Sequence, residues 1–378
     1  MLKKIISYLL IILLLVYSTL IASAETIPEV SAQCAILINA DNFKTLYAKN
    51  ENERRPMAST TKIMTALITL EKAAVNNKIV NITDEMVRVE GSSMGLKPGD
   101  KVTLKSLAEG MLSVSGNDAA NSAAISIAGS IPKFAELMNK RAVELNLTNT
   151  HFVTPSGLDD KEHYTTARDL ALLAAAAMKN PDFENITSKK SITVDYINPN
   201  TTRRFTNHNK LLSLYDGCIG VKTGFTKKSG RCLVSAAERN GIRLIAVTLN
   251  APNDWDDHKK LLDYGFGKVT NVKIDDSAYS IQIPVVGGVT DSVSLKGSAG
   301  NDVTVDSDEA NNIKRTVELP KFVYAPLENG QVVGKIRYTL NSNTIATTDI
   351  VVVSQVNKPE IKENLIQKIF SWIENIFT

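Results

Sequence analysis

Few side chains in this 378-residue chain are suited to metal or disulfide chemistry. There are three cysteines and four histidines, with no Cys-x-x-Cys pair and no paired histidines at ligand spacing, so a zinc site is not expected. An odd number of cysteines leaves at least one thiol without an intramolecular partner. A bond between Cys218 and Cys232 is one alternative, because both lie on runs that resemble paired strands, but we favour buried free thiols. The histidines are expected at the surface or in loops: His151, His163, His208 and His258.

A strong excess of charge of one sign is also missing. The chain has 43 Lys and Arg against 40 Asp and Glu, which gives a formal net charge of +3. Without Lys3 and Lys4 the balance is 41 basic against 40 acidic residues, or about +1. This balance gives no electrostatic reason to expect a nucleic-acid partner. The apolar content of 43% is typical of globular proteins and excludes wholesale disorder.

Residues 1–24 have the layout of a secretory signal peptide. A short basic start is followed by the mostly apolar run 5–21, and Ala22-Ser23-Ala24 provides a small-x-small cleavage site. An uncleaved anchor helix is the alternative, because the apolar run nearly spans a bilayer. We expect an exported protein, and therefore no cytosolic cofactor chemistry and no cofactor.

The next segment, residues 25–267, is predicted to be an α+β domain. Short apolar runs favour strands near its two ends, and Ala- and Leu-rich periodic runs favour helices between them. The predicted strands are 34–38, 45–47, 218–222, 231–237 and 243–249. The predicted helices begin at Ser59 and fill much of 104–179, most clearly 167–178. Turns with Gly, Ser or Asn separate the last three strands and indicate an antiparallel meander.

Two further segments follow. Residues 268–357 are rich in β-branched residues and are predicted to form a small all-β domain with turns near Gly287 and Gly330. This segment has no catalytic constellation, so we interpret it as a spacer or binding module. Residues 358–378 are predicted to form an amphipathic helix, because from 361 onward apolar side chains occupy one half of a helical wheel. We predict that 361–378 lies in a membrane interface; packing on the protein itself or in a dimer is the alternative.

The first element with chemical character is Ser59-Thr60-Thr61-Lys62, at the start of a predicted helix. A spacing of three residues places the Ser59 hydroxyl and the Lys62 amine on one helical face. A serine hydroxyl becomes a nucleophile only beside a base, and burial near a second cation makes a lysine neutral enough to be that base. Ser-x-x-Lys alone is common in exposed helices, so it needs further support.

Two other elements give that support. Ser115-Gly116-Asn117 lies between predicted helices, where a hydroxyl can relay a proton and an amide can hold a substrate amide and contact Lys62. Lys222-Thr223-Gly224 lies at the end of a predicted strand, where a cation and a hydroxyl can bind a carboxylate. Taken singly, the first is equally typical of a helix N-cap and the second of a β-turn.

In this order, Ser-x-x-Lys, Ser-x-Asn and Lys-Thr-Gly resemble the motif set of the penicillin-binding proteins and serine β-lactamases. The flanking sequence is more similar to the low-molecular-weight D-alanyl-D-alanine carboxypeptidases. Segments throughout the chain carry this similarity: 55–66, 91–94, 115–120, 165–170, 216–226 and 259–266. The β-rich segment and the terminal helix also match the layout of that family.

The resemblance implies an antiparallel sheet flanked by helices and a serine carboxypeptidase at the outer face of the cell membrane. Its substrates would be peptidoglycan stem peptides ending in D-Ala-D-Ala, and β-lactams would acylate Ser59 and leave slowly. It further implies that Lys62 is the base, that Ser115 and Lys222 pass a proton to the leaving D-alanine, and that Lys222 and Thr223 bind its carboxylate. Catalytic Asn117 and substrate-binding Gly224 and Phe225 complete the set, with the oxyanion hole formed by the N–H groups of Ser59 and Phe225.

The sequence departs from the family at three positions. Gly95 stands where relatives often have a bulky residue, and Ser156 stands where they have a histidine. Many relatives also have an arginine after the strand that ends near Leu249, and residues 251–257 contain none. That arginine is expected to assist carboxylate binding, and neither Arg243 nor Lys259 can be assumed to replace it.

Other functions fit the sequence less well. A class A β-lactamase shares the motifs but needs a loop glutamate for deacylation, and neither Glu162 nor Glu184 lies in such a motif. A non-catalytic wall-binding protein of the same fold would not need the intact motif residues. Metal-dependent hydrolysis lacks paired ligands.

Overall fold

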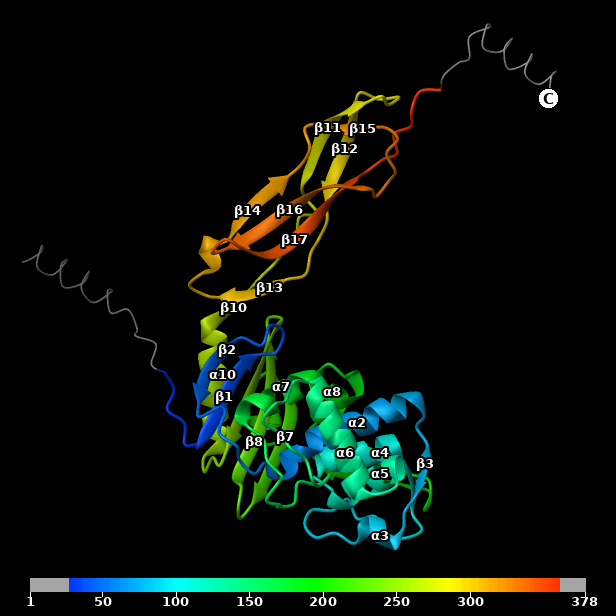
Figure 1. Cartoon of the computed structure of the whole chain (residues 1–378), viewed down its shortest axis with the longest axis vertical. Coiled ribbons are helices and arrows are strands. Elements are labelled where there is room, and N and C mark those ends of the chain that lie inside the picture. The colour runs from blue at the N-terminus through cyan, green and yellow to red at the C-terminus, as the bar shows by residue number, and fades with distance from the viewer. Residues whose placement is uncertain (1–26, 361–378) are drawn as a thin grey trace, which may run out of the picture. The chain divides into compact units, whose positions relative to one another are not determined.

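The structure is a computed structural model, and it describes residues 27–360. The predicted signal peptide and amphipathic helix fall in 1–26 and 361–378, outside the described residues. The chain divides into two compact units between Phe266 and Gly267 (Figure 1). Within 27–360, no helix is both long enough and apolar enough to cross a membrane.

A five-stranded antiparallel sheet forms the centre of the first unit. Its order is β2-β1-β9-β8-β7, so the N-terminal hairpin extends the C-terminal meander. The prediction that strands open and close this unit is therefore confirmed. The strands are β1 (Cys34–Asn39), β2 (Thr45–Lys49), β7 (Cys218–Thr226), β8 (Gly230–Arg239) and β9 (Ile242–Leu249). β7 is an edge strand and runs four residues beyond the predicted end at Lys222.

Helices fill the middle of the first unit, as predicted. The predicted helix start at Ser59 falls in the short 3-10 turn η1 (Ala58–Thr61), which directly precedes α2. The helices are α2 (Lys62–Val75), α3 (Asp84–Val87), α4 (Leu104–Ser113), α5 (Asn117–Ala128), α6 (Ile131–Glu144), α7 (Ala167–Met178), α8 (Pro181–Thr187), α9 (Leu211–Leu214) and α10 (Asp254–Lys268). α7 begins and ends at the predicted residues.

The two faces of the sheet are covered by different helices. Side chains of one face, such as Ile36 and Val247, join the core that α2, α4, α5 and α7 share. α10 covers the other face, where Leu37 and Leu244 lie so near Gly265 that a Cβ there would come within 2.5 Å and 2.7 Å of them. The absence of a side chain at Gly265 thus lets α10 pack closely on the strands.

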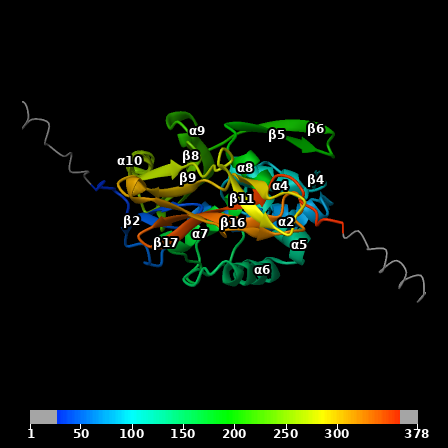
Figure 2. The same ribbon diagram turned by 90° about the horizontal axis from the view of Figure 1, so that it is seen from above.

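Two small antiparallel strand pairs were not predicted. They consist of β3 (Ile79–Asn81) with β4 (Lys101–Thr103), and β5 (Ser191–Tyr196) with β6 (Thr201–Thr206). The second pair lies at the periphery of the unit (Figure 2). Alternate residues of β5 are buried, so the period-two pattern that signals a strand is present in its sequence.

The second unit is almost entirely β, as predicted. A six-stranded sheet of order β14-β16-β17-β12-β11-β15 encloses its own apolar core, and β10 pairs with β13. The predicted turns are present, with Gly287 and Gly330 at φ 71° and 81°. The elements are β10 (Val269–Val272), β11 (Ser280–Val286), β12 (Ser292–Gly297), β13 (Val303–Asp306), η2 (Ala310–Asn312), β14 (Lys314–Glu318), β15 (Val323–Tyr324), β16 (Val332–Leu340) and β17 (Asn343–Val352).

The prediction of surface or loop histidines is wrong for His258, which lies inside helix α10, whereas His163 lies in a loop but is buried there. His163 is 3% exposed and His258 is fully buried, between the hydroxyls of Ser235 and Thr248. Burial lowers the pKa of His258 to about 3, so its imidazole is a neutral part of the core. Isolated histidines in the sequence gave no sign of these buried hydroxyl partners.

The cysteines are free thiols. Cys218 lies opposite Ala237 in the β7–β8 register and Cys232 lies opposite Gly224, so the two are not cross-strand partners. Burial raises the pKa of each thiol to about 11, which leaves them protonated and unreactive at neutral pH.

Candidate active site

The Ser59 turn is shaped by close backbone packing. Ala58 adopts a positive φ of 47°, which is uncommon for a residue with a side chain. β7 passes so near this turn that a Cβ on Gly224 would lie 3.0 Å from Ser59 N and 3.1 Å from Thr60 N. On the other side, a Cβ on Gly157 would lie 1.9 Å from Ala58 O. Glycine at both positions therefore allows the turn to be held from two sides.

His163 stabilises the Ser59 turn through a chain of hydrogen bonds. Its Nδ1 accepts from Val153 N at 2.9 Å, so its proton is on Nε2, which is 2.7 Å from Thr61 Oγ1. Thr61 Oγ1 in turn donates to Ala58 O at 2.8 Å. Burial lowers the pKa of His163 to about 4, so this chain of hydrogen bonds stays neutral and fixed near pH 7.

Lys62 begins α2 and is fully buried. Its Nζ lies 3.0 Å from Ser59 Oγ, 2.6 Å from Asn117 Oδ1 and 2.6 Å from Ser156 O. Burial, together with the charge of Lys222, lowers the pKa of Lys62 well below its ordinary value. The amine that the sequence placed beside Ser59 is thus both in contact with it and biased toward the neutral form.

The three contacts of Lys62 fit a neutral amine. Asn117 Oδ1 and Ser156 O are acceptors only, so each requires one N–H. An amine with two hydrogens donates to both and directs its lone pair at the third partner, Ser59 Oγ. A serine hydroxyl can donate to that lone pair. The geometry therefore prepares Lys62 to accept the proton of Ser59.

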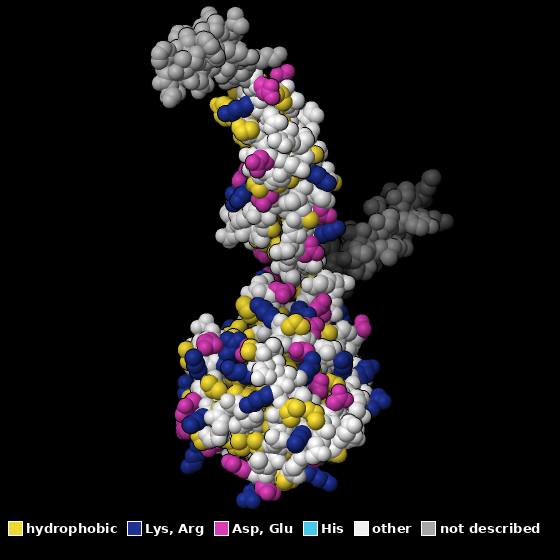
Figure 3. All heavy atoms as spheres, turned by 90° about the vertical axis from the view of Figure 1, so that its right-hand side faces the viewer, with side chains coloured by type: hydrophobic (Ala, Val, Ile, Leu, Met, Phe, Trp, Pro, Cys, Tyr) yellow, Lys and Arg dark blue, Asp and Glu magenta, His cyan; other side chains and the backbone are white. Residues whose placement is uncertain are grey.

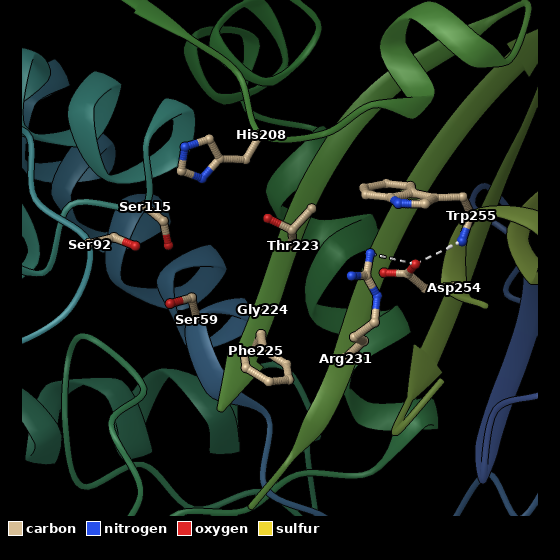
Figure 4. A pocket seen from close by; sticks show the side chains of 10 residues that line it. All are labelled: Ser59, Ser92, Ser115, His208, Thr223, Gly224, Phe225, Arg231, Asp254 and Trp255. Carbon is tan, nitrogen blue, oxygen red and sulfur yellow. Dashed lines mark hydrogen bonds and ion pairs between the residues drawn. The ribbon is translucent and has the colours of Figure 1, made fainter. Parts of the chain in front are cut away.

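Ser115 and Asn117 come from the connection between α4 and α5. Ser115 has a φ of 61°, and Figure 4 shows its hydroxyl pointing into the same cavity as Ser59. Asn117 opens α5 and is held by two hydrogen bonds, from its Nδ2 to Glu90 O at 2.6 Å and from its main-chain N to Ser92 O at 2.7 Å. Both predicted residues of this motif therefore meet Ser59 and Lys62 in space.

The third motif lies on β7. Lys222 is almost fully buried and donates to Thr223 O at 2.9 Å. Burial lowers its pKa to about 7. Thr223 lines the cavity, and Gly224 is the residue that lets β7 approach the Ser59 turn.

The open edge of β7 provides an N–H group at the cavity. Phe225 lies opposite Arg231, whose carbonyl oxygen accepts from Ala251 N on the far side of β8. Opposite residues in an antiparallel ladder either face each other or both face away, so the Phe225 N–H faces the free edge. The Ser59 turn packs against β7 at Gly224, so the main-chain N–H groups of Ser59 and Phe225 come from neighbouring segments.

All eight predicted site residues are brought together around or beside one cavity of about 320 Å³. Sequence reasoning missed half of its lining, which consists of Ser59, Ser92, Ser115, His208, Thr223, Gly224, Phe225, Arg231, Asp254 and Trp255 (Figure 4). Of the missed residues, only Ser92 carried a signal in the sequence, because it lies in 91–94, one of the segments that resemble the carboxypeptidase family. Among the described residues, no three His, Cys, Asp or Glu side chains are placed to hold a metal ion.

The departure at Ser156 has a simple structural explanation. The contact with Lys62 is made by the Ser156 main-chain oxygen, and Pro155 O similarly accepts from Thr65 Oγ1 at 2.7 Å. Since main-chain atoms make these contacts, the side chain at position 156 can vary without removing them.

On the face that Figure 3 presents, Lys and Arg side chains are interspersed with Asp and Glu side chains.

Two family models match the chain. One, described as D-alanyl-D-alanine carboxypeptidase (peptidase family S11), matches residues 21–253. The other, described as penicillin-binding protein 5, C-terminal domain, matches residues 266–358.

Among curated proteins, the D-alanyl-D-alanine carboxypeptidase DacF of Bacillus subtilis is 32% identical over 339 residues, or 86% of each chain. The corresponding enzyme DacC of Escherichia coli is 35% identical over 364 residues, 90% of this chain and 88% of its own. Among solved structures, penicillin-binding protein 5 of Haemophilus influenzae has a TM-score of 0.64 at 32% identity, covering 88% of this chain and 99% of that one. The Streptomyces K15 DD-transpeptidase has a TM-score of 0.61 at 35% identity, covering 64% and 99%. The expected fold is thereby confirmed.

Proposed function

The chain belongs to the D-alanyl-D-alanine carboxypeptidase family, and from this premise we propose that Ser59 is the nucleophile with which it removes the terminal D-alanine of peptidoglycan stem pentapeptides. One observation carries the assignment. The amine of Lys62, biased toward its neutral form by burial, lies 3.0 Å from the Ser59 hydroxyl.

In the acylation step, the Ser59 oxygen attacks the carbonyl carbon of the penultimate D-alanine while Lys62 Nζ accepts the hydroxyl proton. The carbonyl π electrons move to oxygen, and the N–H groups of Ser59 and Phe225 stabilise the resulting oxyanion. Lys62 becomes an ammonium with three donors, all of which have acceptors in place: Ser59 Oγ, Asn117 Oδ1 and Ser156 O. The contacts of the base thus suit both of its protonation states.

Collapse of the tetrahedral intermediate breaks the peptide bond and leaves an ester on Ser59. The departing amine needs a proton, which Lys62 returns through the Ser115 hydroxyl, with Lys222 next to that path. Lys222 and Thr223 hold the carboxylate of the leaving D-alanine. Water then attacks the ester while Lys62 accepts its proton, and Lys62 returns that proton to the departing Ser59 oxygen as the shortened peptide leaves. β-Lactams acylate Ser59 by the same first step, but their leaving amine stays attached to the acyl group because it is part of the opened ring.

Labelling with a fluorescent penicillin tests the nucleophile. The wild type should become covalently labelled, and the Ser59→Ala variant should not. Thr60→Ala is a suitable neighbouring control, because Thr60 Oγ1 donates to Met57 O and does not face the cavity. An unlabelled wild type, or a labelled Ser59→Ala variant, would refute the proposal.

Release of D-alanine separates the carboxypeptidase from the two alternatives. The wild type should release D-alanine from a pentapeptide and should hydrolyse penicillin only slowly. Rapid turnover of penicillin would instead identify a β-lactamase, although neither Glu162 nor Glu184 lines the cavity and Glu184 is paired with Arg243. Failure of both reactions would identify a non-catalytic protein of the same fold.

We extend the proposal to the location of the enzyme. The layout of residues 1–24 supports export, and the apolar half of the wheel formed by 361–378 supports attachment to the outer face of the cell membrane. Deleting residues 361–378 should move the protein from the membrane fraction to the supernatant. Retention of the deletion variant in the membrane fraction would contradict the attachment.

A further inference from the structure

The chain lacks an arginine in the segment that follows β9, where many relatives have one for carboxylate binding. Asp254 and Trp255 begin α10 in this segment and line the cavity. Arg243 and Lys259, which could not be assumed to replace that arginine, do not line the cavity. Arg243 forms ion pairs with Glu184 and Glu238, and Lys259 pairs with the exposed Asp256.

Arg231 is the only arginine or lysine among the ten residues that line the cavity. It comes from β8, next to the strand that carries the Lys-Thr-Gly motif, and lies opposite Phe225 in the register. Because opposite residues point to the same face of a sheet, its side chain extends over the face that Thr223 and Phe225 share. Figure 4 shows its guanidinium between Thr223 and Trp255.

A buried carboxylate holds this guanidinium in place. Arg231 Nη2 donates to Asp254 Oδ1 at 2.8 Å, and the Asp254 side chain is only 4% exposed. Trp255 N donates to the same oxygen at 3.0 Å, and the Arg231 guanidinium carbon lies 5.7 Å from the centre of the Trp255 ring. Two residues, Asp254 and Trp255, therefore fix the direction of a side chain that is itself 43% exposed.

Most of the donors of Arg231 remain available to a ligand. A guanidinium has five N–H groups in a planar fork, and within residues 27–360 a single recorded hydrogen bond, to Asp254, uses one of them. A guanidinium kept only for stability would have its remaining donors on protein acceptors or away from the cavity. Here they are at the cavity that contains Ser59 and Thr223.

We propose that Arg231 binds the terminal carboxylate of the substrate together with Thr223, and that Asp254 and Trp255 position it for this contact. The proposal rests on the function proposed above, because it needs a substrate with a free carboxylate. It assigns to β8 the role that the segment after β9 has in many relatives. An arginine is suited to the role, since its fork binds a carboxylate bidentately and keeps its charge at every physiological pH.

Two acyl donors test the proposal directly. One is an N-acylated peptide ending in D-Ala-D-Ala, and the other is the same acyl-D-alanine as a neutral methyl thioester, which has no carboxylate in its leaving group. In Arg231→Leu, kcat/KM for the peptide should fall about 10- to 100-fold, the usual loss for a hydrogen bond to a charged group. Turnover of the thioester should stay within about twofold, since it never uses this contact.

Three further variants complete the test. Arg231→Lys should recover part of the loss, because it restores the charge without the fork. Asp254→Asn should lower peptide turnover less than Arg231→Leu does, again without slowing the thioester. Lys228→Leu removes an exposed cation from the β7–β8 turn and should change neither substrate.

The outcomes separate this inference from the function on which it depends. A wild type that turns over neither donor refutes the proposed function itself. A wild type that turns over both, with Arg231→Leu slowing both equally or neither, overturns the role of Arg231 alone. If Arg231→Leu fails to fold, as judged by its melting temperature, Arg231→Gln keeps the polar stem and is judged by the same ratio of peptide to thioester turnover.

Discussion

Asp276 of the second unit and the two buried lysines of the active site show two different ways of burying a charge. In the second unit, the Asp276 carboxylate is 4% exposed and is surrounded by donors. Arg315 Nε donates to it at 2.8 Å and Tyr338 Oη at 3.0 Å, and the Thr348 hydroxyl donates to its other oxygen. Burial alone would raise the pKa of Asp276, but these hydrogen bonds hold it below its ordinary value. The charge is kept because it is fully compensated.

In the first unit, two buried cations lack such compensation. Within 27–360, no acidic side chain forms a recorded ion pair with Lys62 or Lys222, and burial lowers the pKa of both. Each loses its charge more easily than a lysine in water. The neutral acceptors around Lys62 satisfy its hydrogen bonds in either state, so the amine can take up and release a proton.

This difference separates structural from catalytic use of a buried charge. A compensated ion fixes a fold, because changing its protonation state would disrupt every partner. An uncompensated ion reduces stability, but its proton can move at neutral pH. The activity that depends on Lys62 and Lys222 and the stability that depends on Asp276 therefore come from different charged residues, and substitutions can separate them.

The largest expected effect is on Lys62. Lys62→Met fills the same buried space without a basic atom, so acylation by penicillin should slow about 10³-fold, within the range for loss of a general base. Lys72→Met, at an exposed position of the same helix, is the matched control and should label at the wild-type rate. Wild-type labelling of Lys62→Met would show that Lys62 is not the base and that its buried charge has a structural role instead.

The next effect is on stability and belongs to the second unit. Asp276→Ala leaves the Thr348 hydroxyl and the Arg315 guanidinium without their acceptor, which should destabilise this unit by about 3 kcal/mol. Hydrogen exchange of peptides from 267–360 should accelerate, while penicillin labelling at low temperature is unchanged. Asp308→Ala removes an exposed acid of the same unit and should alter neither measurement. Loss of labelling in Asp276→Ala would contradict the separation of roles.

A smaller effect is on the pH dependence of the free energy of unfolding, which should differ between the two units. The pKa of Lys222 is about 7 in the fold, below the value of an unfolded lysine, so above pH 7 the unfolded chain binds more protons. The stability of the first unit should therefore rise with pH from 7 to 8.5, by up to about 1.4 kcal/mol per pH unit from this group. Asp276, with a lowered pKa, stabilises the second unit throughout that range and loses its effect only in acid.

Hydrogen exchange at several pH values measures this slope for each unit separately. Lys222→Met should remove the part of the slope that comes from Lys222 and leave the second unit unchanged. An identical slope in the wild type and in Lys222→Met would show that Lys222 is not deprotonated in this range.

The sequence predicted the parts of this site that depend on local spacing. Ser59 and Lys62 share one helical turn, and Lys222, Thr223 and Gly224 are consecutive, so their mutual positions follow from helix and strand geometry. The three motifs also carry the family resemblance, and that resemblance predicted that their side chains lie together in one site. The α7 boundaries and the β7–β9 meander were equally local and were predicted closely.

What the sequence did not predict depends on pairing across the chain. Arg231 reaches the cavity because of the register between β7 and β8, and its carboxylate partner Asp254 comes from the start of α10. His163 lies in a loop and is buried against Thr61 of η1, which is 102 positions away. Asp276 and Thr348 are 72 residues apart. No periodicity or motif within one segment contains such information.

The smallest expected effect is at Ser156, where the sequence departs from its relatives. Only the main-chain oxygen of Ser156 contacts Lys62, and Gly157 fixes that part of the backbone against Ala58. Ser156→Ala should therefore leave the rate of penicillin acylation within about twofold of the wild type, since no side-chain hydrogen bond to Lys62 is lost. The Gly157→Ala variant is the informative contrast, because its Cβ would displace the same backbone and should slow acylation. A large loss in Ser156→Ala would mean that the hydroxyl itself tunes the base, and the contrast between compensated and uncompensated charge would then have to include a third polar side chain beside Lys62.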